Sequence, residues 1–372
     1  MATFLMAGGG TGGHVVPALA VARALAARGH QAFFVGTRHG FEARLVPAQG
    51  FPIEWIEIGG LKNVGLLRRL KTLWQLPLAV LSSLRIIRRR KPAALFSMGG
   101  YVAAPPMLAA ILARVPLVVM EPNAMAGFTS RRMARFATRA LLTFEETRAA
   151  FPAGVGEMTG LPVREEFFAI EPAAKARVPF RVLVTGGSRG ARTLNRAVRE
   201  ALPLLAQAGL PVHLTVQCGA DALPEMALAL KDHQVSGEAK VFIDDMPAAF
   251  ADASLIVARA GAGSISELAA AGKPSLLVPF PFAADDHQTK NADALARAGA
   301  ATVVADAAMN GERFFREIQQ AMSDPERLDA MAIAARGLAK RGAAQRAAAI
   351  LEEVARLTAP AKAGTIIKRN VF

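Results

Sequence analysis

The strongest constraint on the fold is the regular alternation of short apolar runs with helical patterns along the chain. Each apolar run ends near glycine or another small residue, and a helical pattern follows it. This alternation predicts an α/β fold of doubly wound parallel sheets, covered by helices on both faces. The predicted strands are Thr3–Ala7, Ala32–Gly36, Ala94–Met98, Leu117–Glu121 and Ala140–Thr143, followed by Arg181–Thr185, Val212–Gln217, Lys240–Ile243, Ser254–Ala258, Ser275–Pro279 and Ala301–Val304.

The pattern restarts after Glu171–Pro179, a polar, alanine-rich stretch that we interpret as an interdomain linker. The sequence GGTGG at 9–13 in the first half corresponds to GGSRG at 186–190 in the second. Each follows a first strand and opens a helix. We therefore expect two similar halves facing each other across a cleft, with ligands outside the carboxyl ends of the strands. The alternative is that any two strand-to-helix turns share glycines.

Composition narrows the class of protein. A chain of 372 residues with 52% hydrophobic residues is expected to form two folded domains. The only cysteine, Cys218, excludes an intramolecular disulfide and a CxxC zinc cluster, so a reducing compartment is expected. The net charge of +14 favours an anionic partner, such as nucleic acid, an acidic lipid or a phosphorylated substrate. Nucleic acid is the least favoured of these, because one tyrosine and two tryptophans offer few stacking platforms.

Residues 65–91 form a basic stretch with eight cations and no acid, and Leu73–Leu84 within it is uncharged. Twelve uncharged residues are too few to cross a bilayer, which takes about 20. Apolar side chains flanked by arginine and lysine suit the surface of an anionic membrane. A buried helix with solvated ends is the alternative.

The first glycine loop contains Gly8-x-Gly10-x-x-Gly13, the spacing of a dinucleotide fingerprint. An NAD site also needs an acid at the end of the second strand, and the nearest acid, Glu42, lies beyond that strand. No lysine of a P-loop follows either. The loop then predicts an anion-binding helix N-terminus beside His14. His14 is a candidate general base or a hydrogen-bonding residue without chemistry.

A second signal is the sequence RAGAGSISE at 259–267, where a strand ends and a short helix is expected to open at Ser264. Glycines and first-turn amides can hold a diphosphate, and Glu267 can accept hydrogen bonds from a ribose. Ser264 and Glu267 also have the spacing of a capping box, which is the structural alternative. No Asp-x-Asp pair occurs in the chain, so we expect no metal at the site.

These residues together resemble the MurG family of glycosyltransferase family 28, over about 3–357. The resemblance lies in GGGTGGHVVPALAVA, SMGGYVAAPPMLAA, EPNAMAGFTSRRMARFA, TGLPVRE, GGSRGARTLN and the run from FIDDMPAAF to DDHQTKNA. It implies a GT-B fold of two Rossmann-like domains, at 1–163 for the acceptor and the membrane and at 164–340 for the donor. A helix at 341–357 would return to the first domain, and 358–372 would be a tail.

The resemblance also implies the roles of individual residues in binding UDP-N-acetylglucosamine (UDP-GlcNAc), without a cofactor. His14 is the implied base and Tyr101 lies on the acceptor side. Arg164 and Ser188 would contact the diphosphate, Ile243 the uracil, Glu267 the ribose, and Gln288 and Asn291 the GlcNAc. The remaining donor contacts would be Thr11, Gly12, Gly13, Asn123, Ala262, Gly263, Ser264, Ile265 and Ser266.

The implied reaction is an inverting transfer of GlcNAc to the C4 hydroxyl of the muramyl sugar of lipid I, the undecaprenyl-diphosphate-linked muramyl-pentapeptide, which gives lipid II for peptidoglycan. The expected location is peripheral, on an anionic membrane surface at the cytoplasmic face of the bacterial inner membrane, without nucleic acid. Alternatives are another GT-B transferase acting on a different lipid or natural product, a UDP-GlcNAc epimerase, and a basic RNA-binding protein.

Overall fold

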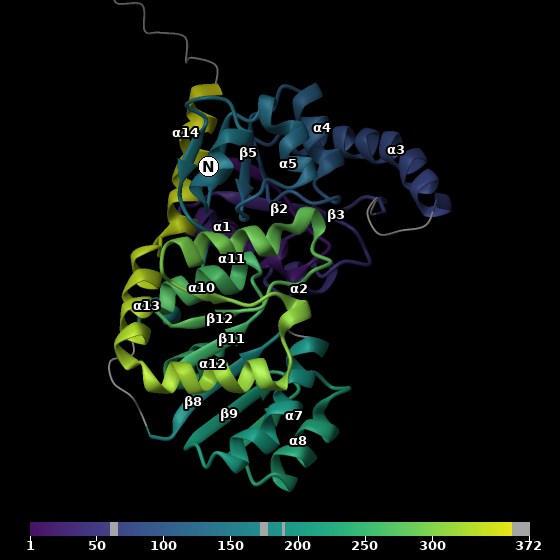
Figure 1. Cartoon of the computed structure of the whole chain (residues 1–372). Helices are drawn as coiled ribbons and strands as arrows, with labels where there is room; N and C mark the ends of the chain where they lie inside the picture. Colours follow the sequence, from purple (N-terminus) through teal and green to yellow (C-terminus); the bar gives the residue numbers. More distant parts are fainter. Residues whose placement is uncertain (60–65, 172–177, 188–189, 359–372) are drawn as a thin grey trace, which may run out of the picture.

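The computed structural model describes residues 1–59, 66–171, 178–187 and 190–358, with side chains left out at 66–73 and 358. Figure 1 shows two α/β lobes stacked on each other, with the first half of the chain in one lobe and most of the second half in the other. Four of the sequence-based assignments fall wholly or partly outside what the structure describes. They are Ser188 of the second glycine turn, most of the linker, the start of the basic stretch at 65–73, and the tail from residue 359 onward.

The first lobe contains a sheet of seven parallel strands in the order β3-β2-β1-β4-β5-β6-β7. Central strand β1 pairs on both sides, so that Leu5 lies opposite Phe33 and Leu95. Successive side chains of β1 pack into the two cores on opposite faces of the sheet, because neighbouring residues of a strand point to opposite sides. The strands are β1 (Thr3–Ala7), β2 (Gln31–Gly36), β3 (Ile53–Trp55), β4 (Ala94–Ser97), β5 (Leu117–Glu121), β6 (Arg139–Leu142) and β7 (Gly156–Met158).

Helices cover both faces of this sheet. Phe4 and Met6 pack on the side of α1, whereas Leu5 and Ala7 pack on the side of α3 and α4. Burial on both faces explains why the strands are apolar throughout instead of alternating with polar residues. The helices of this lobe are α1 (Gly12–Ala27), α2 (Glu42–Ala48), α3 (Leu66–Arg90), α4 (Ala104–Leu112) and α5 (Phe128–Met133).

The second lobe repeats the arrangement with six parallel strands in the order β10-β9-β8-β11-β12-β13. Counted from its own first strand, this is the same order as in the first lobe, which confirms the predicted pair of doubly wound halves. The strands are β8 (Phe180–Thr185), β9 (Val212–Gln217), β10 (Gly237–Lys240), β11 (Leu255–Ala258), β12 (Ser275–Leu277) and β13 (Thr302–Val303).

The helices of the second lobe follow the apolar spacing of the sequence. Helix α7, for example, buries Leu194, Val198, Ala201 and Leu205, which lie on one face at intervals of three and four residues. The helices are α6 (Glu165–Phe168), α7 (Arg192–Gln207), α8 (Leu223–Asp232), α9 (Met246–Asp252), α10 (Ala262–Ala271), α11 (His287–Arg297), α12 (Gly311–Ser323) and α13 (Pro325–Gly337).

Most predicted strands match the structure to within two residues, but three edge elements do not. The strands β3 and β7 are only three residues long each, and the apolar pattern did not reveal them. The strand predicted at Lys240–Ile243 is wrong, because β10 ends at Lys240. The apolar run that follows leaves the sheet, exposing Phe242 and burying Ile243. Edge strands contribute little apolar burial, so their sequences carry a weaker signal.

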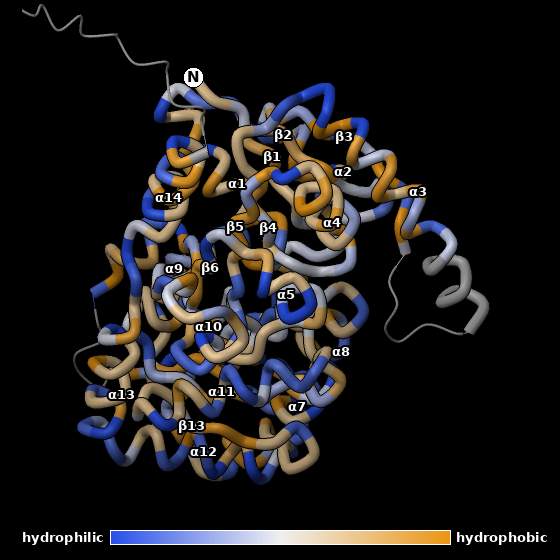
Figure 2. The backbone as a smooth tube through the Cα atoms, turned by 90° about the horizontal axis from the view of Figure 1, so that it is seen from above, coloured by the Kyte–Doolittle hydropathy of each residue, from blue (hydrophilic) through white to orange (hydrophobic). Residues whose placement is uncertain are grey.

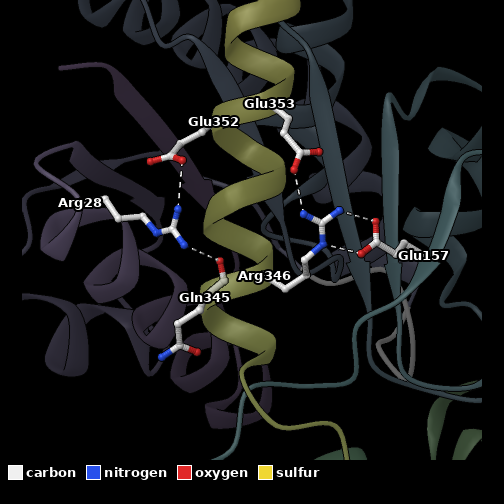
Figure 3. Close-up of polar contacts among 6 residues, drawn as sticks. All are labelled: Arg28, Glu157, Gln345, Arg346, Glu352 and Glu353. Atoms are coloured by element: carbon white, nitrogen blue, oxygen red, sulfur yellow. Dashed lines mark hydrogen bonds and ion pairs between the residues drawn. The ribbon is translucent and has the colours of Figure 1, made fainter.

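The last helix, α14 (Ala343–Thr358), lies in the first lobe, where it packs against α1. Ala347, Leu351 and Val354 belong to the same core as β1. Figure 3 shows two ion-pair groups on opposite sides of this helix. Arg28 reaches Glu352 at 3.0 Å, while Arg346 forms a forked contact to Glu157 at 2.6 and 2.9 Å. The domain limits 1–163 and 164–340 stay a proposal.

Helix α3 lies along the outer edge of the first lobe in both Figure 1 and Figure 2. One face is buried, with Ala79, Ser83 and Ile87 against the lobe. The opposite face exposes Trp74, Leu78, Leu81, Arg85 and Arg88, spaced by four and three residues. Helix α3 thus has a buried face and an exposed apolar stripe with a cationic end, and contact of that stripe with a membrane stays a prediction. No helix in the described ranges is long and apolar enough to cross a membrane.

Replacement of Arg346 by glutamine should destabilise the protein by about 1 kcal/mol, because the ion pairs are half-exposed and partly screened. The Arg346 guanidinium lowers the pKa of Glu157. The contribution of the Arg346–Glu157 ion pair to the stability of the folded protein is therefore complete above the ordinary carboxyl pKa of about 4.3. It is lost as the pH falls below that value. Urea unfolding at pH 7 and pH 3.5 measures this, with Arg356→Gln on the same helix as the control. An equal loss at both pH values would contradict the prediction.

Candidate functional site

The carboxyl ends of the two sheets face each other, and the candidate residues gather on the loops between them. Ala262, the first residue of α10 in the second lobe, packs against the core cluster of the first lobe that includes Val15 of α1. Arg131 and Asp285 form an ion pair of 3.6 Å across the same gap. The N-termini of α1 and α10 therefore lie near the boundary between the lobes. The predicted pairing of the turns at 9–13 and 186–190 stays a prediction, because residues 188 and 189 lie outside the described ranges.

His14 lies in the first turn of α1, and its Nδ1 is 3.2 Å from the carbonyl oxygen of Gly9. A carbonyl can only accept, so Nδ1 carries the proton and Nε2 keeps its lone pair. The pKa of His14 is lowered, mainly because the side chain is buried. His287 of the second lobe lowers it further. The Gly9 carbonyl, Glu121 and Glu42 act in the opposite direction and offset part of this lowering. A neutral imidazole with a free Nε2 can act as a base near neutral pH.

The loop after β4 lies over the first glycine loop. Gly99 and Gly100 both have positive φ, and Tyr101 follows them. A Cβ on Gly10 would lie 2.9 Å from the Tyr101 ring, and a Cβ on Gly100 would lie 3.0 Å from the ring of His14. The backbone of each loop thus packs against a side chain that follows the other loop. Tyr101 and His14 come together at one end of the cleft, with Thr11, Gly12 and Gly13 beside them at the start of α1.

Asn123 and Asn291 join the two lobes at the floor of the cleft. Asn291 is completely buried, and its side chain accepts from the amide of Ala124 at 2.8 Å. Its Nδ2 donates at 3.1 Å both to the Asn123 side chain and to the carbonyl of Ala260. Both N–H donors of the Asn291 amide are therefore used within the protein. Donation from Asn291 to a sugar would require one of these hydrogen bonds to break, and its predicted contact with the GlcNAc stays a prediction.

The helix expected to open at Ser264, within the sequence at 259–267, begins earlier than the sequence suggested. Helix α10 starts at Ala262 with Gly261 as N-cap, and no side chain caps it. Ser264 is therefore inside the first turn rather than at its start, and the capping-box interpretation is wrong. The carboxylate of Glu267 is not used by the helix end, which leaves it available for a ligand. Gly263 and Ser264 present first-turn amides toward the cleft end of the helix.

Glu267 and Arg164 form the electrostatic centre of this side. Burial raises the pKa of Glu267 to about 7, against the opposite effect of the Arg164 guanidinium. Arg164 caps the short helix α6, and its guanidinium lies over the ring of Phe167, 5.1 Å from the ring centre. An exposed arginine and a half-protonated carboxyl beside a helix N-terminus can together hold an anion and a pair of hydroxyls.

Gln288 and Ile243 complete the donor side. The Gln288 side-chain oxygen accepts from the amides of Ala260 and Phe280, at 3.2 and 3.0 Å. Its NH2 group is thereby oriented and keeps donors for a ligand. Ile243 is buried in the core of the second lobe, so it can offer a ligand its backbone rather than its side chain.

Two of the predicted donor contacts point elsewhere in this conformation. Ile265 and Ser266 line a separate cavity of about 360 Å³ between the lobes, which Gly160, Leu161 and Lys340 also line. Within the described ranges, the Ser266 hydroxyl is buried without a hydrogen-bond partner. Both residues stay predictions as ligand contacts.

Sequence reasoning missed two buried carboxylates that shape the loops. Glu121 accepts from the amides of Asn123 and Gly127, so it organises the loop after β5. Glu42 accepts from the Gly10 amide at 2.8 Å. The available signal was the pair Gly36 and Gly40 shortly before a first-turn glutamate, since bare backbone next to an acid leaves room for its carboxylate to pack closely.

Comparison with known proteins agrees with this geometry. Residues 4–142 match the model of the glycosyltransferase family 28 N-terminal domain, and residues 181–347 match that of the family 28 C-terminal domain. A relative from Solibacter usitatus is 58% identical over 355 residues, covering 95% of this chain and 97% of the relative. Another from Methylococcus capsulatus is 44% identical over 89% of this chain and 92% of its own length. Both are named UDP-N-acetylglucosamine–N-acetylmuramyl-(pentapeptide) pyrophosphoryl-undecaprenol N-acetylglucosamine transferase.

Solved structures show the same architecture. The crystal structure of Acinetobacter baumannii MurG aligns with a TM-score of 0.81 at 33% identity, covering 95% of this chain and 100% of that one. A putative UDP-N-acetylglucosamine 2-epimerase from Listeria monocytogenes aligns with a TM-score of 0.69 at 15% identity, covering 96% and 97%. The latter likeness shows the fold alone, which two-domain enzymes of different chemistry share.

Proposed function

The chain belongs to the MurG family within glycosyltransferase family 28, and on this premise we propose that it transfers GlcNAc from UDP-GlcNAc to the C4 hydroxyl of the muramyl sugar of lipid I, forming lipid II. The observation that carries this proposal is the 58% identity to a transferase of that name over 95% of the chain. The cleft supports it, because two helix N-termini and a histidine base meet there. The chemistry of the cleft then defines how each side contributes.

The second lobe holds the donor. The first-turn amides of α10 and the Arg164 guanidinium face the diphosphate, so that the negative charge of the departing UDP is stabilised without a covalent intermediate. Glu267 accepts hydrogen bonds from the ribose hydroxyls. Gln288, oriented by its two backbone donors, directs its NH2 group to the sugar. Ser188, in the second glycine turn, is proposed as a further diphosphate contact.

The first lobe holds the acceptor and the base. The C4 hydroxyl oxygen of the muramyl sugar attacks the anomeric carbon from the side opposite the diphosphate, and the bond from that carbon to the diphosphate breaks. The configuration is inverted, and His14 Nε2 takes the hydroxyl proton. Tyr101 and the glycine loop bound this end of the cleft, where they support the acceptor sugar. Positioning of the two substrates supplies much of the rate.

The exposed stripe of α3, defined by Trp74, Leu78, Leu81, Arg85 and Arg88, supports contact with an anionic membrane. Its apolar part can enter the lipid headgroup region while the arginines pair with phosphates. Such contact brings the enzyme to a polyprenyl-linked acceptor. We therefore expect a peripheral enzyme at the cytoplasmic face of the inner membrane, where lipid I and the nucleotide sugar are both accessible.

The central test is transfer of radiolabelled GlcNAc to a short-chain lipid I analogue, with a reaction lacking acceptor as control. His14→Ala should lower kcat by about 100-fold or more with little change in donor affinity, because general bases contribute about 10²- to 10⁴-fold. His233→Ala, at the end of α8, is the matched histidine control. Release of free sugar without acceptor would favour an epimerase. Unchanged turnover of His14→Ala would exclude the base assignment.

Donor affinity should depend on the ionisation of Glu267, whose pKa is about 7. A carboxylate accepts hydrogen bonds from both ribose hydroxyls, whereas a protonated acid does so less well. UDP-GlcNAc should therefore bind more tightly as the pH rises from 6 to 8, as measured by calorimetry. Its diphosphate diester does not titrate in this range. Glu267→Gln should bind about 10-fold or more weakly at pH 8 and lose the pH dependence. Equal pH dependence in both proteins would contradict the assignment.

Binding to vesicles that contain phosphatidylglycerol should weaken about 10-fold in Leu78→Ser, since burial of a leucine side chain is worth about 1.5 kcal/mol or more. Leu228→Ser is the matched control, because Leu228 is an exposed leucine of similar accessibility on α8 of the second lobe. Cosedimentation gives the partition, and vesicles of phosphatidylcholine alone test the contribution of charge. If both variants bind like the native protein, α3 is not the membrane surface.

A further inference from the structure

The first glycine loop is built around a buried carboxylate. Glu42, the first residue of α2, is completely buried. Its Oε2 accepts from the Gly10 amide at 2.8 Å, and its Oε1 accepts from the Thr37 amide at 2.9 Å and the Thr37 hydroxyl at 2.7 Å. All three partners are donors. A carboxylate, which only accepts, satisfies every one of them.

The glycines of the loop leave the space that this carboxylate occupies. A Cβ would lie 2.6 Å from the Glu42 carboxyl group at Gly9, 2.5 Å from the Glu42 side chain at Gly36, and 2.0 Å from its carboxyl group at Gly40. Ordinary side chains cannot make such contacts. Part of the glycine content of this region therefore serves an internal anion, and the Gly10 amide is not free for a substrate phosphate.

Glu42 and His14 contact the same peptide group from opposite ends. The carbonyl of Gly9 and the N–H of Gly10 belong to one planar amide. The Glu42 carboxylate accepts a hydrogen bond from the N–H of this amide, and His14 Nδ1 donates to the carbonyl oxygen of the same amide at 3.2 Å. The groups follow the order carboxylate, peptide, imidazole, and Nε2 lies on the side of the imidazole away from the peptide.

We propose that Glu42 is a positioning residue for the transfer reaction, acting on His14 through the Gly9–Gly10 peptide. The carboxylate fixes the orientation of this peptide, whose carbonyl in turn fixes the tautomer and direction of the imidazole. Hydrogen bonds in such a chain polarise one another, so the carbonyl becomes a stronger acceptor and stabilises the imidazolium that forms when His14 takes a proton. The role resembles that of the aspartate in a Ser-His-Asp triad, with a peptide between.

This inference rests on His14 being the base of the proposed function. The charged and titratable groups that face His14 are Glu42 from α2, Glu121 from the end of β5, and His287 from α11 across the cleft. Glu42 and Glu121 raise the pKa of His14 and His287 lowers it. Tyr101 also borders the loop. Burial raises the pKa of Tyr101, and the charge of Glu42 raises it further. Removal of the Glu42 charge therefore lowers the pKa of His14.

The test is Glu42→Gln, measured in the transfer assay over a range of pH. An amide has one accepting atom in place of two, so a donor is left facing an NH2 group. We expect kcat to fall about 10- to 100-fold, with the donor KM within about twofold of native. The acid limb of the kcat profile should move to lower pH. Glu317→Gln, which alters a buried carboxylate on α12, should leave both unchanged.

A double variant separates positioning from general loosening of the fold. If Glu42 acts through His14, then His14→Ala combined with Glu42→Gln is no slower than His14→Ala alone. Multiplied losses, or an unshifted acid limb, would overturn the proposal. Nitrogen-15 NMR of the native enzyme tests it without any variant, since His14 must be the Nδ1–H tautomer. If native enzyme shows no transfer, the proposed function fails. If native enzyme turns over and Glu42→Gln behaves like Glu317→Gln, only this inference fails.

Discussion

The structure depends on two parallel sheets whose carboxyl ends face one another, held in that relation by a completely buried amide. Asn291 of the second lobe hydrogen-bonds Asn123 and Ala124 of the first and the carbonyl of Ala260 in its own lobe. Buried polar groups are costly to leave unpaired, so the lobes cannot separate at this point without losing several hydrogen bonds together. Helix α14 adds a second connection, because this last described helix packs in the lobe that contains β1. Together with the packing of Ala262 and the Arg131–Asp285 ion pair, these two connections join the lobes.

Between the lobes, buried carboxylates lie on the side of the first lobe and positively charged groups on the side of the second. The first lobe places buried carboxylates, Glu42 and Glu121, behind backbone loops, where they organise amides and support a histidine. The second lobe presents a helix N-terminus and Arg164, which suit a departing diphosphate. The displacement proposed above would use both features, since its base gains positive charge and its leaving group gains negative charge.

Prediction from sequence succeeded where the signal was local and repeated. Thr3–Ala7, Leu117–Glu121 and Val212–Gln217 match their strands, because fully buried parallel strands are apolar at every position. It failed at β10 and at the start of α10, where the deciding factors were pairing at a sheet edge and a glycine N-cap without a side-chain signature. The grouping of His14 with Tyr101 came from resemblance. No local pattern could show that Asn291 would be occupied by Asn123, 168 residues away.

The sequence by itself determined the alternation of strands and helices, the two glycine turns and the family, since each is written in short-range spacing or in ordered motifs. Only the tertiary structure decided how the glycines are used. Gly9 follows β1 and is distant in the chain from Gly36 and Gly40, which lie at and just after the end of β2, yet all three make room for the single side chain of Glu42. The carboxylate reaches the loop because α2 packs beside β2 and α1. Such a contact depends on the distances between folded elements, which no spacing along the chain encodes.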